Sequence, residues 1–306
     1  MSEGSPDLEG RCSGGQAIGG CFRFFELLVL SAMVDDLVEV ARIIETHEAL
    51  VWSTCVEATA AVPGNPLKAE VDRSGNTPLC TLAALNFASF NRVIAFGAVT
   101  PATDEDIEVV KAFYSSRSET RYVIEVTPAS RPESLGPSLV RRGLRPTGAG
   151  VAKCWRTIRD IPPEPSNIEV RELSGDHRDQ YVAVNLSAWG LPEFFSPWFG
   201  ATFGLPGFRH YGVFDGDVLT SSVAMHVSED VAWTGFGATR PAYQGRGYQS
   251  ARIIRMMHDA AEMGCHIMHN EAGTGTPDSP SPSLHNLLKT GFTRIYDKEA
   301  FSPFPG

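Results

Sequence analysis

Apolar and polar positions alternate most clearly in the last third of the chain, where they predict a strand followed by a helix. Residues 231–237 are mostly apolar, aromatic or β-branched, which is typical of a buried strand. Apolar residues then recur at helical spacing, at Ala251, Ile254, Met257 and Ala261. The pattern therefore predicts a strand, a turn and a helix that Gly264 closes.

The turn between this strand and this helix has almost no side chains. Gly245 and Gly247 let the backbone fold tightly and approach a ligand closely. The first amides of the helix have no partners within it, and the helix N-terminus adds a partial positive charge. Together with the full charge of Arg246, these features predict a phosphate-binding turn.

One interpretation of this turn is a dinucleotide-binding site. Gly245-x-Gly247-x-x-Ser250 is close to the pattern G-x-G-x-x-G, and Glu271 lies 21 residues beyond Ser250, where such sites have an acid for the ribose. However, that motif opens a domain that needs several more strand-helix units, and only 56 residues follow Ser250. An NAD-dependent oxidoreductase is therefore the third hypothesis.

The second interpretation rests on a resemblance. Gln244-x-x-Gly247-x-Gln249, preceded by a strand and Pro241, resembles the pyrophosphate loop of the GCN5-related N-acetyltransferase (GNAT) superfamily. A strand at 265–271, a Gly/Pro/Ser-rich loop, a short helix ending at Gly291-Phe292 and a last strand follow. This order is similar to the end of the GNAT domain, and the resemblance covers about the last 140 residues.

The first half repeats this order of elements. Thr100-Pro101, a helix, a strand, a helix and Gly143-Leu144 correspond to the elements from Arg240-Pro241 to Gly291-Phe292, over 42 and 50 residues. We therefore predict an α/β protein with two GNAT-like domains in tandem, each a mixed, mostly antiparallel sheet flanked by helices. The predicted parts are a disordered N-terminus at 1–20, a degenerate domain at 21–160, a Pro-rich linker at 161–167 and a catalytic domain at 168–306.

The first domain is expected to have lost its phosphate site. Where the second half has Gln244-Gly245-Arg246-Gly247, the first has Ala102-Thr103-Asp104-Glu105, with no glycine and two acids. Acids at this place would repel a phosphate. The domain is therefore expected to cover and shape the active one, with an unusual second donor site as the alternative.

The resemblance implies that the co-substrate is acetyl-CoA and that an amine attacks its thioester carbonyl directly. It assigns donor binding to the loop, to the strand before it and to the last helix. The implied donor-binding residues are Phe236, Gly237, Ala238, Gln244, Gly245, Arg246, Gly247, Tyr248, Gln249, Ser250 and Asn286. Gly235 and Gly237 fit a strand that a ligand approaches closely, and they fit tight packing of the adjacent helix equally well.

The catalytic residues are less well defined. Many GNAT members carry a tyrosine four residues before the terminal glycine, but this chain has Leu287 there, so Ser283 or Asn286 is expected to touch the donor instead. Glu271, at the end of a strand, is the first candidate for the general base, and His226 is the second. A carboxylate at that position would serve equally to cap a loop or to pair with an arginine.

An aromatic segment and several histidines complete the list of candidates. Residues 189–199 are dense in rings, and in GNAT proteins this region covers the acceptor cleft. The candidates for the substrate or acyl pocket, which ordinary core packing explains equally well, are Trp189, Phe194 and Trp198. His47 fits a surface or core-edge position. His266 and His269 would face opposite sides of a strand, so no metal site is predicted.

Composition narrows the class of protein. The 306 residues are 42% hydrophobic and 20% charged, which is typical of a soluble globular protein. The six cysteines form no C-x-x-C pair, which indicates reduced thiols in a cytoplasm rather than disulfides or a zinc ribbon. A net charge of -10 argues against nucleic-acid partners and would attract cationic substrates. Residues 22–34 are too short and too interrupted by charge for a signal peptide or a membrane span.

The leading prediction is a cytoplasmic N-acetyltransferase, monomeric or homodimeric, that moves an acetyl group from acetyl-CoA to the primary amine of a small molecule. An antibiotic-like or other cationic metabolite would suit the acidic chain. The alternative, which the absent tyrosine favours, is a non-catalytic acyl-CoA-binding or sensing protein. No nucleic-acid or membrane partner is expected.

Overall fold

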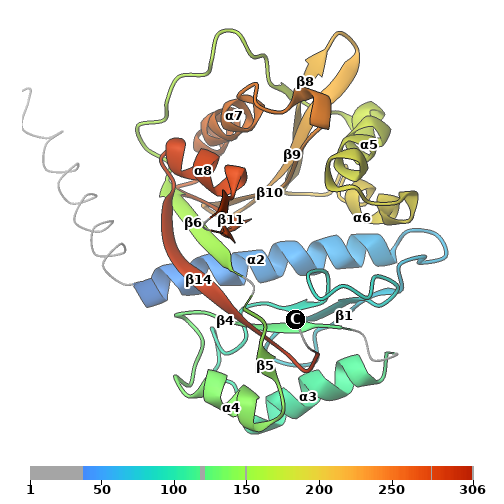
Figure 1. Cartoon of the computed structure of the whole chain (residues 1–306), viewed down its shortest axis with the longest axis vertical. Coiled ribbons are helices and arrows are strands. Elements are labelled where there is room, and N and C mark those ends of the chain that lie inside the picture. The colour runs from blue at the N-terminus through green and yellow to red at the C-terminus, as the bar shows by residue number, and fades with distance from the viewer. Residues whose placement is uncertain (1–36, 118–120, 149, 277, 305–306) are drawn as a thin grey trace, which may run out of the picture.

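The computed structural model describes residues 37–117, 121–148, 150–276 and 278–304 (Figure 1). The N-terminus at 1–20 and the apolar segment at 22–34 lie outside these described residues. The described helices are α2 (Leu37–Ala60), α3 (Asp104–Ser115), α4 (Leu135–Arg141), α5 (Arg178–Trp189), α6 (Ser196–Gly200), α7 (Tyr248–Glu262) and α8 (Pro282–Lys289). The described strands are β1 (Ala69–Asp72), β2 (Leu79–Leu82), β3 (Arg92–Val93), β4 (Val123–Val126), β5 (Arg145–Pro146), β6 (Val151–Thr157), β7 (Arg171–Glu172), β8 (Phe208–Asp215), β9 (Val218–Ser228), β10 (Val231–Thr239), β11 (Ile267–Gly273), β12 (Gly275–Thr276), β13 (Ser279–Pro280) and β14 (Thr293–Ser302).

One sheet of ten strands runs through both halves of the chain. Its order is β3-β4-β14-β6-β11-β10-β9-β8-β7, and β5 pairs with β14. Among the described strands, only β3 with β4 and β10 with β11 pair in parallel. The predicted mixed and mostly antiparallel α/β fold is confirmed. A dinucleotide-binding domain needs a doubly wound, mostly parallel sheet, so that alternative does not fit.

The two halves exchange strands. β6 comes before the predicted linker, yet it lies between β11 and β14 of the second half. β14 pairs with β6 over its first part, and its last residues pair with β4 and β5 of the first half. Figure 1 shows β14 running from the upper layer of the molecule to the lower one. The domain boundary at 161–167 stays a prediction, but it does not divide the sheet.

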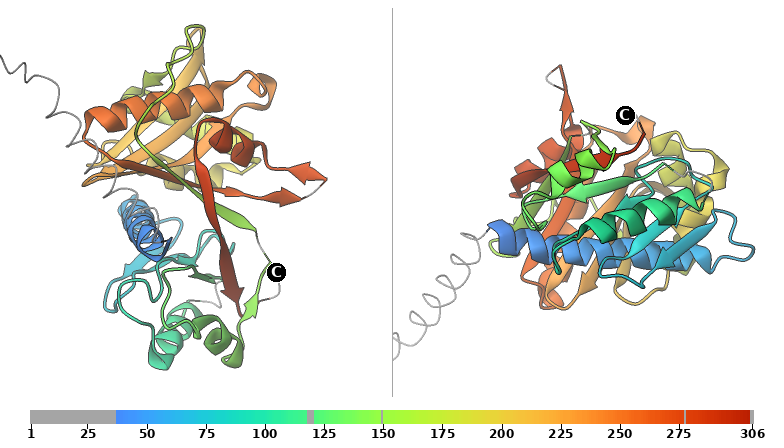
Figure 2. Two further views of the ribbon diagram at one scale, coloured as in Figure 1. Left: turned by 90° about the vertical axis from the view of Figure 1, so that its left-hand side faces the viewer. Right: turned by 90° about the horizontal axis from the view of Figure 1, so that it is seen from below.

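Helix α2 lies between the two layers, as the left view of Figure 2 shows end-on. It packs on β1 and β2 on one side and on β10 and α6 on the other. Its buried residues therefore occur on all faces of the helix, including consecutive positions such as Val51 and Trp52. Three of its buried residues, Glu45, His47 and Glu48, are polar and face the interior between the halves.

The sheet of the second half is covered on both faces. Successive side chains of a strand point to opposite faces. Accordingly, Ala232 packs in the cluster formed with α7 and α8, whereas Trp233 packs with α2, α5 and α6. Helix α7 begins at the predicted turn and ends before Gly264, which has φ +85°, as the sequence predicts. The turn therefore lies at the C-terminal end of β10, between this central strand and α7.

Candidate functional site

Strands β10 and β11 separate at the centre of the sheet. They pair in parallel over three residues each, Val231–Trp233 with Ile267–His269, and then diverge. β10 continues to Thr239 along β9, and β11 continues to Gly273 along β6. The facing edges of the two strands are thus open beyond Trp233 and His269. We call this opening the fork.

A β-bulge lies on the β10 side of the fork. The pairing of β10 with β9 shifts its register between Gly235 and Ala238. Phe236, in the bulge, has φ +54°, which is uncommon for a residue with a side chain. Because a bulge leaves its extra residue outside the ladder, backbone groups of Phe236 and Gly237 are available to a ligand lying in the fork, whereas the carbonyl of Ala238 already accepts hydrogen bonds from Ser221 and Arg252.

The two glycines of β10 have different reasons to be glycine. A Cβ atom at Gly235 would collide with the indole of Trp233, so this glycine makes room for packing on its own strand. At Gly237 a Cβ atom would meet nothing closer than 3.9 Å. Gly237 is exposed and leaves the edge of the fork uncovered. Packing therefore explains Gly235, although its partner is Trp233 of the same strand and not the adjacent helix, and close approach of a ligand remains the explanation for Gly237.

The turn after β10 has the geometry that the sequence predicts. Gly245 and Gly247 have φ +78° and +81°, and Gly247 is the N-cap of α7. Among the described residues, no hydrogen-bond acceptor contacts the amides of residues 245–248. Arg246 is exposed and stacks on Tyr243, with its guanidinium carbon 4.7 Å from the ring centre. Free amides, a helix N-terminus and an arginine therefore meet at one exposed turn.

Three residues that are predicted to contact the acetyl donor connect α7 and α8 by hydrogen bonds. Gln249 Nε2 donates a hydrogen bond to Ser283 Oγ over 3.0 Å, and Asn286 Nδ2 donates to Gln249 Oε1 over 2.9 Å. The structure thus brings together residues from two separate motifs. Leu287, at the position of the missing tyrosine, is fully buried in the core.

Arg252 is a residue that sequence reasoning missed. It lies one turn into α7, is 2% exposed, and donates a hydrogen bond from Nη1 to the carbonyl of Ala238 over 3.1 Å. In the described part of the chain no carboxylate pairs with it, and burial lowers its pKa to about 9. An unpaired cation therefore lies directly behind the bulge and the turn. Arg252 lies off the predicted apolar stripe of Ala251, Ile254, Met257 and Ala261, so the sequence pattern gave no signal that it is buried.

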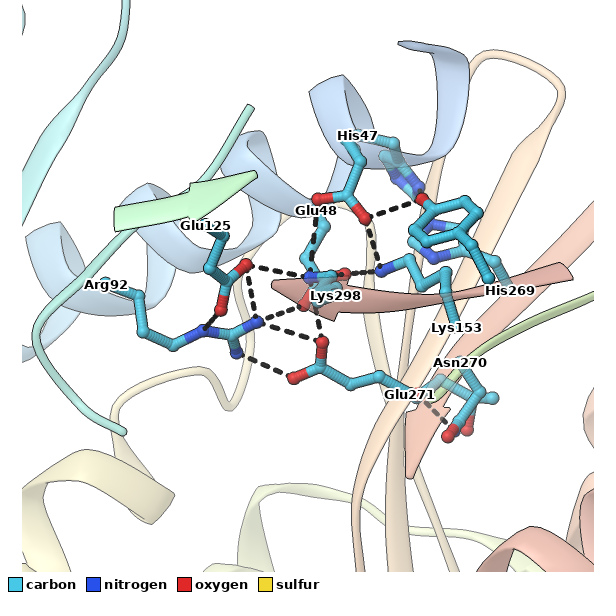
Figure 3. Close-up of polar contacts among 12 residues, drawn as sticks. His47, Glu48, Arg92, Glu125, Lys153, His269, Asn270, Glu271 and Lys298 are labelled. Atoms are coloured by element: carbon cyan, nitrogen blue, oxygen red, sulfur yellow. Dashed lines mark hydrogen bonds and ion pairs between the residues drawn. The ribbon is translucent and has the colours of Figure 1, made fainter. Parts of the chain in front are cut away.

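A buried network of charges lies between the two halves (Figure 3). Its members, from α2 and five strands, are Glu45, Glu48, Arg92, Glu125, Lys153, Glu271 and Lys298. Burial opposes the charge of both lysines and lowers the pKa of Lys153 to about 8. The carboxylates of Glu125 and Glu271 outweigh burial at Lys298 and raise the pKa of this lysine. Four carboxylates and three cations leave one excess negative charge when all are ionised.

Glu271 belongs to this network, which does not suit its predicted role as the general base. Its two oxygens lie 2.7 and 2.9 Å from the guanidinium of Arg92, and Lys298 Nζ lies 3.0 Å away. Burial opposes ionisation of Glu271, but Arg92 and the lysines outweigh it and hold its pKa well below the usual range. The other predicted role, pairing with an arginine, is the one that the structure shows.

His226, the second candidate for the base, lies on β9 and is 5% exposed. Its Nδ1 is 3.1 Å from Nε2 of His47, and Phe208 packs edge-on against its ring. Burial lowers its pKa to about 4, so the ring is neutral at pH 7. The predicted surface or core-edge position of His47 is wrong, because this histidine is buried and hydrogen-bonds both His226 and His269.

The three aromatic candidates do not form one pocket. Trp198 is 1% exposed and packs in the core against Trp52, with ring centres 5.1 Å apart. Trp189, the last residue of α5, and Phe194, in the segment between α5 and α6, are 58% and 48% exposed. For Trp198 the packing explanation is correct, although its ring also lies 5.7 Å from that of Phe236 at the bulge.

Comparison with known proteins identifies this architecture. No family model matches the sequence, and no curated protein matches it. Among solved structures, a GCN5-related N-acetyltransferase from Kribbella flavida is 14% identical, with a TM-score of 0.57 over 82% of this chain and 96% of its own. One from Sphaerobacter thermophilus is 15% identical, with a TM-score of 0.50 over 66% and 68%. The chain has the GNAT fold. At these identities the likeness establishes the fold and leaves the activity open.

The first half is a second, altered copy of the GNAT sheet. Its parallel pair, β3 with β4, is followed by Ala95 with φ +60°, as the parallel part of β10, Val231–Trp233, is followed by Phe236 with φ +54°. Here, however, the chain itself occupies the edge. Arg131 donates its amide to the carbonyl of Gly97 and accepts the amide of Ala102, at 3.0 and 2.8 Å. A small cavity of about 30 Å³ lies beside this segment and is lined by residues that include Gly97 and Ala102.

The turn of the first half is also closed by its own side chains. Thr103 and Asp106 form a capping box, so each side chain accepts a backbone amide at the start of α3. The amides of Thr103 and Asp106 are therefore satisfied. No described helix is long and apolar enough to cross a membrane, and the described residues contain no group of three or more His, Cys, Asp or Glu side chains that could hold a metal.

Proposed function

We propose that this chain is an N-acetyltransferase that moves an acetyl group from acetyl-CoA to the primary amine of a small molecule. The observation that carries the proposal is the fork with its bulge at Phe236, which lies next to a turn with free amides at the N-terminus of α7. A ligand with a diphosphate at one end and an extended amide chain at the other fits both features.

The donor would lie along the open edge of β10. The free amides of residues 245–248 and the guanidinium of Arg246 would bind the diphosphate. The uncovered backbone at Gly237 would pair with the pantetheine amides. Arg252 would add positive charge from behind without touching solvent, where the low dielectric strengthens its field. The donor set therefore suits coenzyme A.

The reaction follows from this placement. The amine nitrogen attacks the thioester carbonyl carbon, the C–S bond breaks, and the coenzyme A thiolate leaves and gains a proton. Ser283 Oγ accepts a hydrogen bond from Gln249, so its own hydrogen is free to point at the sulfur. A hydroxyl of ordinary acidity cannot give that proton away unless another group replaces it, so Ser283 orients the sulfur rather than supplying the proton.

The acceptor is proposed to be a small cationic amine, because the chain carries a net charge of -10 and the buried network has an excess carboxylate. Glu271 is the end of that network nearest solvent, with 24% of its side chain exposed. The non-catalytic alternative, an acyl-CoA-binding or sensing protein, is favoured by Leu287 in place of the tyrosine and by the ion-paired state of Glu271.

Release of free thiol from acetyl-CoA, with a panel of aminoglycosides, polyamines, amino acids and short peptides, tests the proposal. We expect at least one amine to accelerate release. Arg246→Ala should raise the KM for acetyl-CoA about tenfold, as for the loss of an interaction worth about 1.4 kcal/mol. Arg209→Ala, which removes another exposed arginine, should leave KM unchanged.

Two other outcomes are informative. If coenzyme A raises the melting temperature but no amine accelerates thiol release, the non-catalytic alternative replaces the proposal. If coenzyme A neither shifts the melting temperature nor reacts, the assignment of the fork and the turn as a donor site is wrong.

A further inference from the structure

Three buried histidines form a hydrogen-bonded chain across the sheet. His226 on β9 and His269 on β11 are both register partners of Trp233 on β10, so the two histidines point to the same face of the sheet. His47 of α2 lies over them from the first half. Its Nε2 is 3.1 Å from His226 Nδ1, and its Nδ1 is 3.0 Å from His269 Nε2. Figure 3 shows His47 and His269 facing each other next to the charge network.

The two ends of this chain lie in different surroundings. His269 belongs to the last pair of residues before the fork opens, and its Nδ1 is fully buried without a hydrogen-bond partner in the described structure. At the other end, His226 Nε2 lies against Gly207, which has no side chain to cover it. His226 keeps 5% of its surface exposed, whereas His269 has none. The chain therefore leads from the fully buried ring of His269, at the last residue pair before the fork, to the partly exposed ring of His226.

All three rings are neutral at pH 7. Burial, with the charges of His226 and Lys153, lowers the pKa of His47 to about 3. Burial, Lys153, His47 and Lys298 place the pKa of His269 well below its usual range, although Glu271 acts in the opposite sense. Three neutral imidazoles share three ring protons. Two of these occupy the two hydrogen bonds, and the third sits at one end, on His269 Nδ1 or on His226 Nε2.

A single histidine in this place would be a poor base, because its imidazolium would be buried next to two lysines. A chain of three hydrogen-bonded histidines avoids forming a buried imidazolium. When one end accepts a proton and the other end releases one, every ring stays neutral and only the tautomers change.

We propose that His269, His47 and His226 form a proton relay that serves the acetyl transfer described above, on which this inference rests. The amine enters uncharged, having lost its first proton to water. As its nitrogen bonds to the carbonyl carbon, it gives a second proton to the bare Nδ1 of His269. Nε2–H of His269 passes to His47 Nδ1, Nε2–H of His47 passes to His226 Nδ1, and Nε2–H of His226 leaves to water.

The same path runs backward when the C–S bond breaks. His269 Nδ1–H protonates the thiolate, the two hydrogen bonds reverse, and His226 Nε2 takes one proton from water. The rings end in the tautomers in which they began, so the relay needs no ring rotation between turnovers. One proton leaves the nitrogen and one reaches the sulfur, which balances the step and supplies the acid that Leu287 does not.

Nuclear magnetic resonance of the full chain with ¹⁵N-labelled histidine tests the relay without coenzyme A or an amine. At pH 7 we expect couplings across two N–H···N hydrogen bonds that share His47, and ring-nitrogen shifts averaged between two tautomers at His226 and His269. His47→Asn should remove both couplings and fix the outer rings in one tautomer each. His210→Asn is the matched control, because His210 is similarly buried and, within the described residues, its ring hydrogen-bonds Thr202 Oγ1 and no other histidine.

Rings fixed in single tautomers in the wild-type chain, or outer rings indifferent to His47→Asn, would overturn the relay. This result is independent of whether any amine is acetylated, so its failure is distinguishable from that of the proposed function. With an amine that supports turnover, His47→Asn should lower kcat about a hundredfold, as general-base variants do, with the KM for acetyl-CoA unchanged. A kcat equal to that of the His210→Asn variant would overturn the catalytic role of the relay.

Discussion

At the scale of single residues, the fork shows how neighbouring positions serve different needs. Gly235 and Gly237 are two residues apart on one strand, and sequence alone gives them the same two explanations. The structure separates them, because the Trp233 indole fills the space above Gly235, whereas a Cβ atom at Gly237 would meet nothing closer than 3.9 Å. Packing and ligand binding are thus interleaved along β10, and substitutions can address them one at a time.

We predict that Gly235→Ala impairs stability, whereas Gly237→Ala impairs the binding of coenzyme A. Gly235→Ala should lower the free energy of unfolding by about 1–3 kcal/mol, the usual range for overpacking a core, because the new methyl group collides with Trp233. Gly237→Ala should change stability little and weaken the binding of coenzyme A. Urea unfolding and calorimetric titration measure the two effects. Equal losses of stability would contradict the distinction.

Buried neutral histidines should make the fold sensitive to acid. Burial lowers the pKa of His210 to about 3, whereas an unfolded histidine titrates near 6.5. Between these two pH values, His210 is protonated in the unfolded chain and neutral in the folded one. Its contribution to the free energy of unfolding is therefore complete above pH 6.5 and is lost as the pH falls toward 3. The free energy of unfolding should therefore decline by about 1.4 kcal/mol per pH unit for this one group.

Urea unfolding of the wild-type chain and of His210→Asn between pH 7 and pH 4.5 measures this slope. The two curves should converge as the pH falls, since the variant lacks the titrating group. Parallel curves would show that His210 titrates alike in both states.

At the scale of elements, the exchanged strands decide which parts of the chain can fold alone. β6 fills the place between β11 and β14, and it buries Ala152 and Cys154 in the core of the second half. Cutting the chain at the predicted linker removes this strand. The remaining fragment would expose two unpaired edges and part of its core.

We therefore predict that fragment 161–306 is insoluble or unfolded, whereas fragment 150–306, which keeps β6, has a cooperative unfolding transition. Circular dichroism and analytical size exclusion of both fragments provide the test. A folded, monomeric 161–306 would show that the predicted boundary is a true domain boundary and that β6 is dispensable.

Much of the fold was accessible from the sequence because its signals are local. Helical spacing over Ala251 to Ala261 predicts α7, and the glycines predict the turn and its left-handed backbone. The repeated order of elements predicts a second GNAT-like half. The exchange of β6 and β14 was not accessible, since strand order in a sheet depends on contacts between residues far apart in the sequence.

The candidate site was predicted in part for the same reason. Gln249, Ser283 and Asn286 come from motifs, and the structure brings them together. His47 and five members of the charge network come from the first half of the chain, so no local pattern links them to Glu271 or His269. The aromatic density near Trp198 was visible, but a single sequence does not distinguish a core from a pocket.

At the scale of the whole molecule, one half offers an open fork while the other has closed its own. The backbone of Arg131 pairs with Gly97 and Ala102 where a donor would pair, and Thr103 and Asp106 cap the helix that would face a phosphate. The first half instead contributes α2, which carries His47, Glu45 and Glu48 to the sheet of the second half. Loss of one site thus accompanies a new role in completing the other.

The resulting prediction is that the chain binds one coenzyme A, not two. Isothermal titration of the full chain should give a stoichiometry of one per chain. Arg246→Glu should abolish the measurable heat, because a carboxylate would then face the diphosphate at the turn in the second half. Asp104→Lys in the first half should leave both stoichiometry and affinity unchanged, since Thr103 and Asp106 already cap the start of α3. Two equivalents for the wild-type chain, or one remaining equivalent in Arg246→Glu, would place a working donor site in the first half and contradict the proposed division of roles.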